Sequence, residues 1–157
     1  MSFTILLQIG VSLLVFLFSL LAAWYEGSEL LINPGEWEYT AIFTQLLTGG
    51  RIEDAGEILV IDHFVYALKF RPLFPILLYL SGLYFVSLLV YLLSKRTKAF
   101  CYYLFGAAAI NLALSLLFIG SSTDGVRVFL NVMWLVTLTS SLLAAYLLRK
   151  TGVIAKG

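Results

Sequence analysis

The sequence predicts an all-α membrane protein in which four transmembrane helices form a bundle and a structured extracytoplasmic loop joins the first helix to the second. Three observations predict this class. Hydrophobic residues make up 61% of the chain and charged residues 12%, whereas soluble domains average roughly 45–50% and about 25%. Four windows of helix length hold no Asp, Glu, Lys, Arg or His, and the charged residues lie between these windows or after the last one. The whole chain, 1–157, is therefore predicted to be a single integral membrane domain.

The four predicted spans are residues 3–24, 74–93, 99–119 and 128–148. Each has about the 20 residues that a helix needs to cross a hydrocarbon layer of about 30 Å. A charged side chain at the centre of that layer would cost about 2.5–3.5 kcal/mol on the insertion scale, and no window carries this cost. The first window is interpreted as a retained helix and not as a cleaved signal peptide, because no basic residue precedes its long apolar run.

Basic residues predict the orientation of the spans. Six of the ten basic residues lie in two stretches that hold no acidic residue. They are Lys95, Arg96, Lys98, Arg149, Lys150 and Lys156. Because basic loops stay in the cytoplasm, both termini are expected there, and residues 25–71 and 120–127 are expected on the extracytoplasmic side. The predicted location is the plasma membrane, which the chain crosses several times.

The outer segment, residues 25–71, concentrates the polar chemistry of the chain. Eight of the nine acidic residues lie there, and so does the single histidine. Its aromatic residues supply enough apolar surface to pack, which argues against disorder. The pattern from Glu36 to Thr44 fits either a strand with one wet face or a helix, and Ile58 to Ile61 would suit a strand paired with it. Asp62 is expected to be the N-cap of a brief helix over residues 63–70.

Six residues of the outer segment form the candidate docking surface for a protein or peptide. They are Glu36, Trp37, Glu38, Tyr39, Asp62 and His63. The carboxylates of Glu53, Asp54 and Glu57 are groups that a cation such as calcium requires. Their spacing is not that of a dedicated loop, so a solvated acidic face is the preferred interpretation. His63 has no second histidine with which to build a transition-metal site. The sequence therefore predicts no metal and no cofactor.

Polar residues inside the spans predict contacts between helices. The candidates are Gln8, Ser12, Asn111, Ser115 and Asn131. Asn111 and Asn131 are expected to face the bundle interior, with Ser115 as a bridge, because an unsatisfied amide in lipid costs several kcal/mol. Such interhelical hydrogen bonds average only about 0.6 kcal/mol, so they direct packing more than they hold the helices together.

Three stretches carry a family resemblance. They are WYEGSEL from Trp24 to Leu30, NPGEWEY from Asn33 to Tyr39 and, above all, FVYALKFRPLFP from Phe64 to Pro75. These stretches resemble a group of small uncharacterised membrane proteins from spore-forming Gram-positive bacteria, a family defined by a domain of unknown function. The resemblance covers roughly the first two spans and the segment between them. It implies a bacterial plasma membrane and supplies neither a substrate nor a catalytic residue.

Two functions from different classes remain open. The first is a non-enzymatic membrane protein whose acidic aromatic outer segment docks an extracytoplasmic protein or peptide, since the chain lacks H-E-x-x-H, G-x-S-x-G and phosphate-loop motifs. The alternative is a small oligomeric transporter or channel subunit with a path lined by Gln8, Ser12, Asn111 and Asn131. An enzyme of lipid chemistry comes third. The expected partners are the lipid bilayer, the docked molecule and, for the alternative, further copies of the chain. Nucleic acid is not expected, because no basic stripe is present.

Overall fold

The computed structural model describes residues 3–94, 97–121 and 123–150, and every regular element within these ranges is a helix. Four helices are long and apolar enough to cross a membrane, as predicted. They are α1 (Phe3–Gly27), α5 (Leu73–Leu93), α6 (Thr97–Leu116) and α7 (Asp124–Lys150). α1 continues past the predicted span, to Gly27, and α7 begins before its predicted span, at Asp124. The all-α class is confirmed to this extent.

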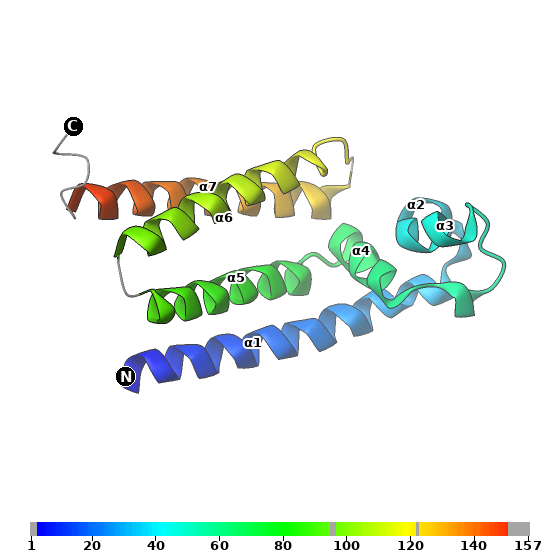
Figure 1. Ribbon diagram of the computed structural model, residues 1–157. Coiled ribbons are helices and arrows are strands. Elements are labelled where there is room, and N and C mark those ends of the chain that lie inside the picture. The colour runs from blue at the N-terminus through cyan, green and yellow to red at the C-terminus, as the bar shows by residue number, and fades with distance from the viewer. Residues whose placement is uncertain (1–2, 95–96, 122, 151–157) are drawn as a thin grey trace.

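The long helices form two antiparallel pairs (Figure 1). α1 packs along α5 and α6 packs along α7, whereas α5 and α6 touch at few points. The α1–α5 pair is close-packed at Gly82, where an added Cβ would lie 3.0 Å from the ring of Phe16. α1 begins and α7 ends at the same end of the molecule, where α5 also passes into α6.

Residues 28–71, called the head segment below, fold at the opposite end of the long helices (Figure 1). Short helices make up this segment: η1 (Ser28–Ile32), η2 (Pro34–Glu36), α2 (Trp37–Thr40), α3 (Ile42–Thr48), η3 (Ala55–Glu57) and α4 (Val60–Phe70). Leu30, Ala41, Ile58 and Tyr66 form their buried core, so the head segment has a small apolar interior of its own.

Of the two alternatives left open for residues 36–44, the helix is the one observed. α2 and α3 cover this stretch and are separated by Ala41, whose ψ of 55° breaks the helix. The strand pairing suggested for Ile58 to Ile61 is wrong, because Leu59 is the N-cap of α4 and no strand occurs among the described residues. The residues that α2 and α3 bury are Thr40 and Thr44, so the apolar alternation does not mark the buried side of either helix.

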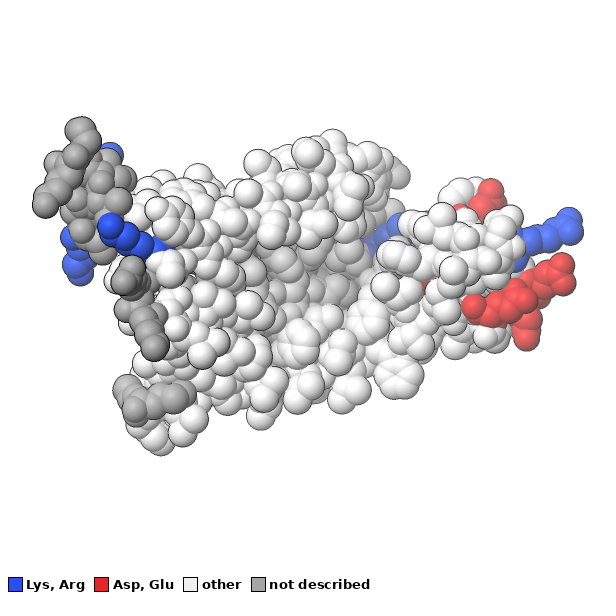
Figure 2. All heavy atoms as spheres, viewed as in Figure 1, with Lys and Arg blue, Asp and Glu red and all other residues white. Residues whose placement is uncertain are grey.

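The described charges separate along the molecule. Acidic side chains gather over the head segment, and basic side chains gather at the opposite end, where α6 begins and α7 ends (Figure 2). Lys98, Arg149 and Lys150 belong to that basic end. The orientation predicted from the basic residues also rests on Lys95, Arg96 and Lys156, which lie outside the described residues.

Candidate docking site on the head segment

Asp62 of α4 is fully buried and binds the start of α3. One carboxylate oxygen accepts a hydrogen bond from the N–H of Phe43 at 2.9 Å. The other oxygen accepts from the N–H and from the hydroxyl of Thr44, at 2.8 and 2.6 Å. The hydroxyl oxygen of Thr44 also accepts a hydrogen bond of 2.9 Å from the N–H of Leu59. The carboxylate of Asp62 in α4 thus accepts from N–H groups at the start of α3, and the hydroxyl of Thr44 in α3 accepts from the N–H at the start of α4. Such N–H groups have no partner within their own helix.

This arrangement corrects the predicted role of Asp62. The residue sits inside α4, two positions after its start, and Leu59 is the N-cap without a side-chain hydrogen bond of its own. Asp62 caps α3 instead. A local sequence rule assigns a capping carboxylate to the helix that follows it, whereas here the folded chain presents the carboxylate to a helix that precedes it.

α4 is the junction between the two pairs of long helices. On one side it crosses α1 at Gly27, where an added Cβ would overlap the backbone carbonyl of His63. On the other side it meets the start of α7, where a Cβ on Gly125 would overlap the carbonyl oxygens of Leu68 and Lys69. The second contact sets the C-terminal carbonyls of α4 against the N-terminal end of α7, which is favourable for their helix dipoles. The head segment is therefore seated on both helical pairs through glycine contacts.

His63 is also buried, with 6% of its surface exposed. Neither ring nitrogen has a hydrogen-bond partner among the described residues. Burial lowers the pKa of His63, and the neighbouring carboxylate of Asp62 opposes this by raising it. Asp62 and His63 consequently support the head segment from within. Their expected place on the docking surface is wrong, because the amphipathic helix that carries them turns both side chains inward.

The other candidates, Glu36 to Tyr39, lie on the surface or at its edge, and two of them line a cavity. This cavity has a volume of about 450 Å³ and is bounded by Pro34, Trp37, Glu38, Gln45, Gly50, Arg51 and Ile52. The indole Nε1 of Trp37 donates to the carbonyl of Leu30 at 2.8 Å, which fixes the ring. The side-chain amide of Gln45 donates to the carbonyls of Trp37 and Glu38 at 2.7 and 2.8 Å. An aromatic face, a carboxylate and a guanidinium thus surround one hollow.

Sequence reasoning did not name Gln45, Arg51 or Ile52 as part of this site. Gly49 and Gly50 have positive φ values of 73° and 95°, and they turn the chain after α3. The turn brings Arg51 to the same hollow as Trp37. The Gly-Gly pair was visible in the sequence as a break in structure, and glycine readily adopts this backbone region. The direction that the chain takes after Gly50 depends on the contacts of Asp62, so the Gly-Gly pair alone did not predict it.

Charge on the head segment is predominantly negative. Glu38, Glu53, Asp54 and Glu57 are exposed there, and Arg51 is the exposed base beside them. The two other bases of the segment are engaged: Arg71 pairs with Glu29 at 3.4 Å, and the amine of Lys69 donates to the carbonyl of Tyr39. Burial lowers the pKa of Lys69. Within the described ranges no three His, Cys, Asp or Glu residues gather closely enough to hold a metal ion.

Asn111 is buried and links three of the long helices. Its Oδ1 accepts a hydrogen bond from the hydroxyl of Tyr79 on α5 at 2.8 Å. Its Nδ2 donates to the carbonyl of Met133 and to the hydroxyl of Thr137, both on α7, at 2.8 and 2.9 Å. The inward position expected for Asn111 is thus observed, and Tyr79 and Thr137 are partners that the sequence did not suggest.

Asn131 does not join this network. It is exposed, and the expectation that it pairs with Asn111 through Ser115 is wrong. Asn131 precedes Met133 by two residues, which places it about 200° around α7 from the face that Asn111 contacts. Ser115 is fully buried and accepts a hydrogen bond from the indole of Trp134 at 3.3 Å. The side of the helix that the sequence predicted is thus observed for Asn111 and not for Asn131.

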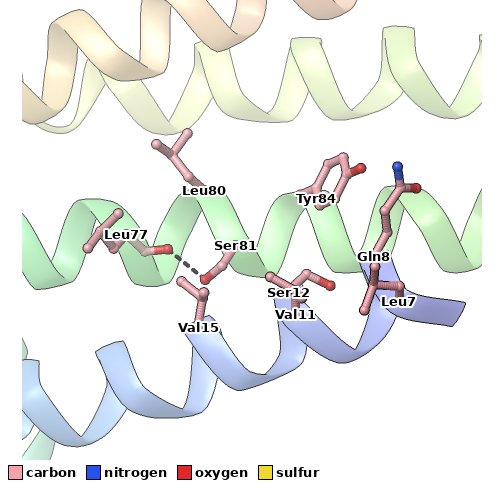
Figure 3. A pocket seen from close by; sticks show the side chains of 9 residues that line it. All are labelled: Leu7, Gln8, Val11, Ser12, Val15, Leu77, Leu80, Ser81 and Tyr84. Carbon is pink, nitrogen blue, oxygen red and sulfur yellow. Dashed lines mark hydrogen bonds between the residues drawn. The ribbon is translucent and has the colours of Figure 1, made fainter. Parts of the chain in front are cut away.

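Gln8 and Ser12 lie on α1 and line a groove of about 440 Å³ beside α5 (Figure 3). The hydroxyl of Ser12 donates to the carbonyl of Ile9 in its own helix, and that of Ser81 likewise donates to Leu77. Gln8 is exposed. The polar residues proposed for a transport path therefore lie in three separate places: this groove, the Asn111 network and the exposed side of α7.

The fold thus defines an all-α protein with four helices that are able to cross a membrane and a compact head segment between the first two. The chain belongs to the family described as a domain of unknown function (DUF4306), whose model matches residues 6–94. It is 36% identical over 90 residues to the uncharacterized protein YjdJ of Bacillus subtilis (strain 168), which is 57% of this chain and 83% of that relative. No solved structure matches the chain. The resemblance to an uncharacterised family of Gram-positive bacteria is confirmed.

The family match ends where α5 ends. It therefore covers α1, the head segment and α5, and leaves α6 and α7 outside. The α6–α7 pair lies outside the part of the chain that the family model matches.

Proposed function

We propose that this protein resides in a bacterial plasma membrane and that its head segment docks a cationic segment of an extracytoplasmic protein or peptide, without catalysis. The observation that carries the proposal is the cavity that Trp37 and Glu38 line, on a head segment whose exposed charge is predominantly negative. A lysine or arginine of the partner would find an aromatic face and a carboxylate together, and both attract a cation.

Orientation of the head segment supports this function. Lys98, Arg149 and Lys150 lie at the end where α1 begins, and the acidic head segment lies at the other end (Figure 2). The positive-inside rule then directs the basic end to the cytoplasm. The head segment faces outward, where it meets secreted or envelope-bound molecules.

A second feature of the head segment supports contact with a partner. α3, the helix that carries Gln45 to the cavity, exposes four apolar side chains. They are Ile42, Phe43, Leu46 and Leu47, with 41–77% of their surface exposed. Exposed apolar groups rimmed by polar residues are typical of interaction surfaces. The partner is therefore expected to present apolar residues next to its positive charge.

Photo-crosslinking in living cells tests the proposal. A photoreactive amino acid at Tyr39, which is 64% exposed beside the cavity, is compared with one at Tyr146, which is 61% exposed near the basic end. The expected result is a discrete band to another protein from Tyr39 alone, and that band should weaken with Glu38→Gln and persist with Asp124→Asn. A band that is insensitive to Glu38→Gln, or equal from both probes, contradicts docking at this cavity.

The alternative of an oligomeric transporter or channel subunit gives a different result. A band at twice the protomer mass from Tyr39 or from Tyr146 would indicate self-assembly. Conductance of the purified protein in a planar bilayer would then decide for a channel. The residues first proposed for the path do not converge in one copy, so such a passage would have to form between copies.

A further inference from the structure

A cavity of about 500 Å³ separates the two pairs of long helices. α5 forms one wall, with Leu83, Ser87 and Tyr91, and α6 and α7 form the other, with residues that include Leu104 and Val136. The volume falls in the range of roughly 300–1,000 Å³ that is common for ligand sites. The family match ends with α5, so the cavity lies between helices inside the matched region and helices outside it.

The lining of this cavity suits a hydrocarbon chain. Most of its side chains are aliphatic or aromatic. The hydroxyl of Ser87 already contacts the carbonyl of Leu83 at 2.7 Å and the hydroxyl of Tyr103 at 3.1 Å. The hydroxyl of Thr139 donates to the carbonyl of Leu135 at 2.9 Å. Since these polar groups are satisfied within the protein, the surface that they leave toward the cavity is apolar.

The cavity extends toward the basic end of the molecule. Tyr91 and Phe100 line it near the end of α5 and the start of α6, and their rings meet edge to face with centroids 5.4 Å apart. Lys98 precedes Phe100 by two residues in α6. The last residue of α7, Lys150, follows the lining residue Leu143 by two turns, which is about 10 Å along the helix. No acidic residue of the described ranges belongs to this end.

We propose that this cavity binds one acyl chain of an anionic phospholipid, whose phosphate lies against Lys98, Arg149 and Lys150. Charge complementarity selects the anionic headgroup, because three bases without a neighbouring acid attract a headgroup of net negative charge more strongly than a zwitterionic headgroup of net charge zero. The lipid fills the space between the α1–α5 pair and the α6–α7 pair and joins them. This inference rests on the membrane placement proposed above and is independent of docking by the head segment.

Native mass spectrometry of the full-length protein in a mild detergent tests the site. The probes are phosphatidylglycerol and phosphatidylcholine with identical acyl chains. The expected result is a one-to-one adduct that forms at least threefold more with phosphatidylglycerol. Val136→Trp, which fills the cavity, should reduce the adduct at least fivefold. Leu135→Trp is the matched control, because Leu135 is 61% exposed and does not line the cavity.

Neutralisation of the basic end tests the headgroup contact separately. The triple variant Lys98→Gln, Arg149→Gln and Lys150→Gln should bind both lipids equally while it keeps the adduct itself. If Val136→Trp fails to fold, as judged by its thermal unfolding, Ser140→Leu fills the same cavity with a smaller change. Equal binding of the two lipids by the unaltered protein, or an adduct that survives the cavity-filling variant, overturns the proposal. Neither result bears on crosslinking at Tyr39, so the two proposals fail independently.

Discussion

The hydroxyl of Thr44 donates to the carboxylate of Asp62 across 2.6 Å in the interior of the head segment. This bond connects the first turns of two short helices that are otherwise too short to be stable alone in water. Through it, α3 is fixed relative to α4, and α4 is seated on both pairs of long helices. The cavity beside Trp37 owes its shape to this chain of contacts, since Gln45 and Arg51 reach the cavity from α3 and the turn that follows it.

Asp62→Ala should therefore loosen the head segment. The substitution leaves the N–H groups of Phe43 and Thr44 without their buried acceptor, and a loss of about 2–4 kcal/mol is expected from hydrogen bonds to a charged group and the unpaired donors. Hydrogen exchange of the α3 amides measures the effect and should accelerate strongly. Asp54→Ala, at an exposed carboxylate, is the control and should leave exchange unchanged. Equal exchange in the two variants would show that Asp62 does not hold α3.

Two glycines of α1 should respond in opposite directions to the same change. Gly27→Ala places a Cβ against the carbonyl of His63 and must displace α4, so a marked loss of thermal stability is expected. Gly10→Ala meets nothing within 4 Å and should stabilise the helix by about 0.5–1 kcal/mol, because alanine loses less conformational freedom on folding. Thermal unfolding of the detergent-solubilised protein provides both values. Similar stability of the two variants would contradict the close crossing of α1 and α4.

The sequence predicted those features of the structure that depend on a local property of the chain, such as the hydropathy of a helix-length window. Length and hydropathy alone locate the four long helices, because a helix buries its backbone polar groups internally whatever its neighbours are. The inward side of Asn111 was also predictable, since an amide in an apolar span needs partners. The start of α1 and the end of α5 fall where they were predicted, whereas the other helix ends differ by a few residues, because turns and interfacial residues carry little hydropathy signal.

The head segment could not be derived in the same way. Several of its contacts join residues 15 to 42 positions apart, such as Thr44 with Leu59 and Arg71 with Glu29. Local rules placed Asp62 as the cap of its own helix, but tertiary packing directs its carboxylate to α3. Asn131 shows the same limit inside the long helices. Its side of α7 depended on which face packs against α6, and residue counting does not give that face.

Acidification should destabilise the head segment through His63. Burial lowers the pKa of His63 below its ordinary value of 6.5, so the unfolded chain binds a proton more readily than the folded one. The neutral ring is tolerated above pH 6.5, and stability falls as the pH drops through 6.5 toward the folded pKa, with a limiting slope of about 1.4 kcal/mol per pH unit for one proton.

Hydrogen exchange of the head amides between pH 7.5 and 5.5, corrected for intrinsic rates, measures this dependence. His63→Gln removes the titrating ring and should flatten the dependence. An identical pH slope with and without His63 would exclude the ring as its source.

Comparison of Asn111→Leu with Asn131→Leu tests the side of the helix on which each amide lies. The sequence predicted that both amides face the bundle interior, whereas in the structure only Asn111 does. Asn111 makes three hydrogen bonds to α5 and α7, and interhelical hydrogen bonds average about 0.6 kcal/mol with a maximum near 1.7. A loss of about 1–2 kcal/mol is therefore expected for Asn111→Leu. Asn131→Leu exposes one more apolar side chain on an outward side of α7 and should be neutral in a micelle. Denaturant titration of both variants in the same detergent gives the comparison, and equal losses would mean that both amides face the interior.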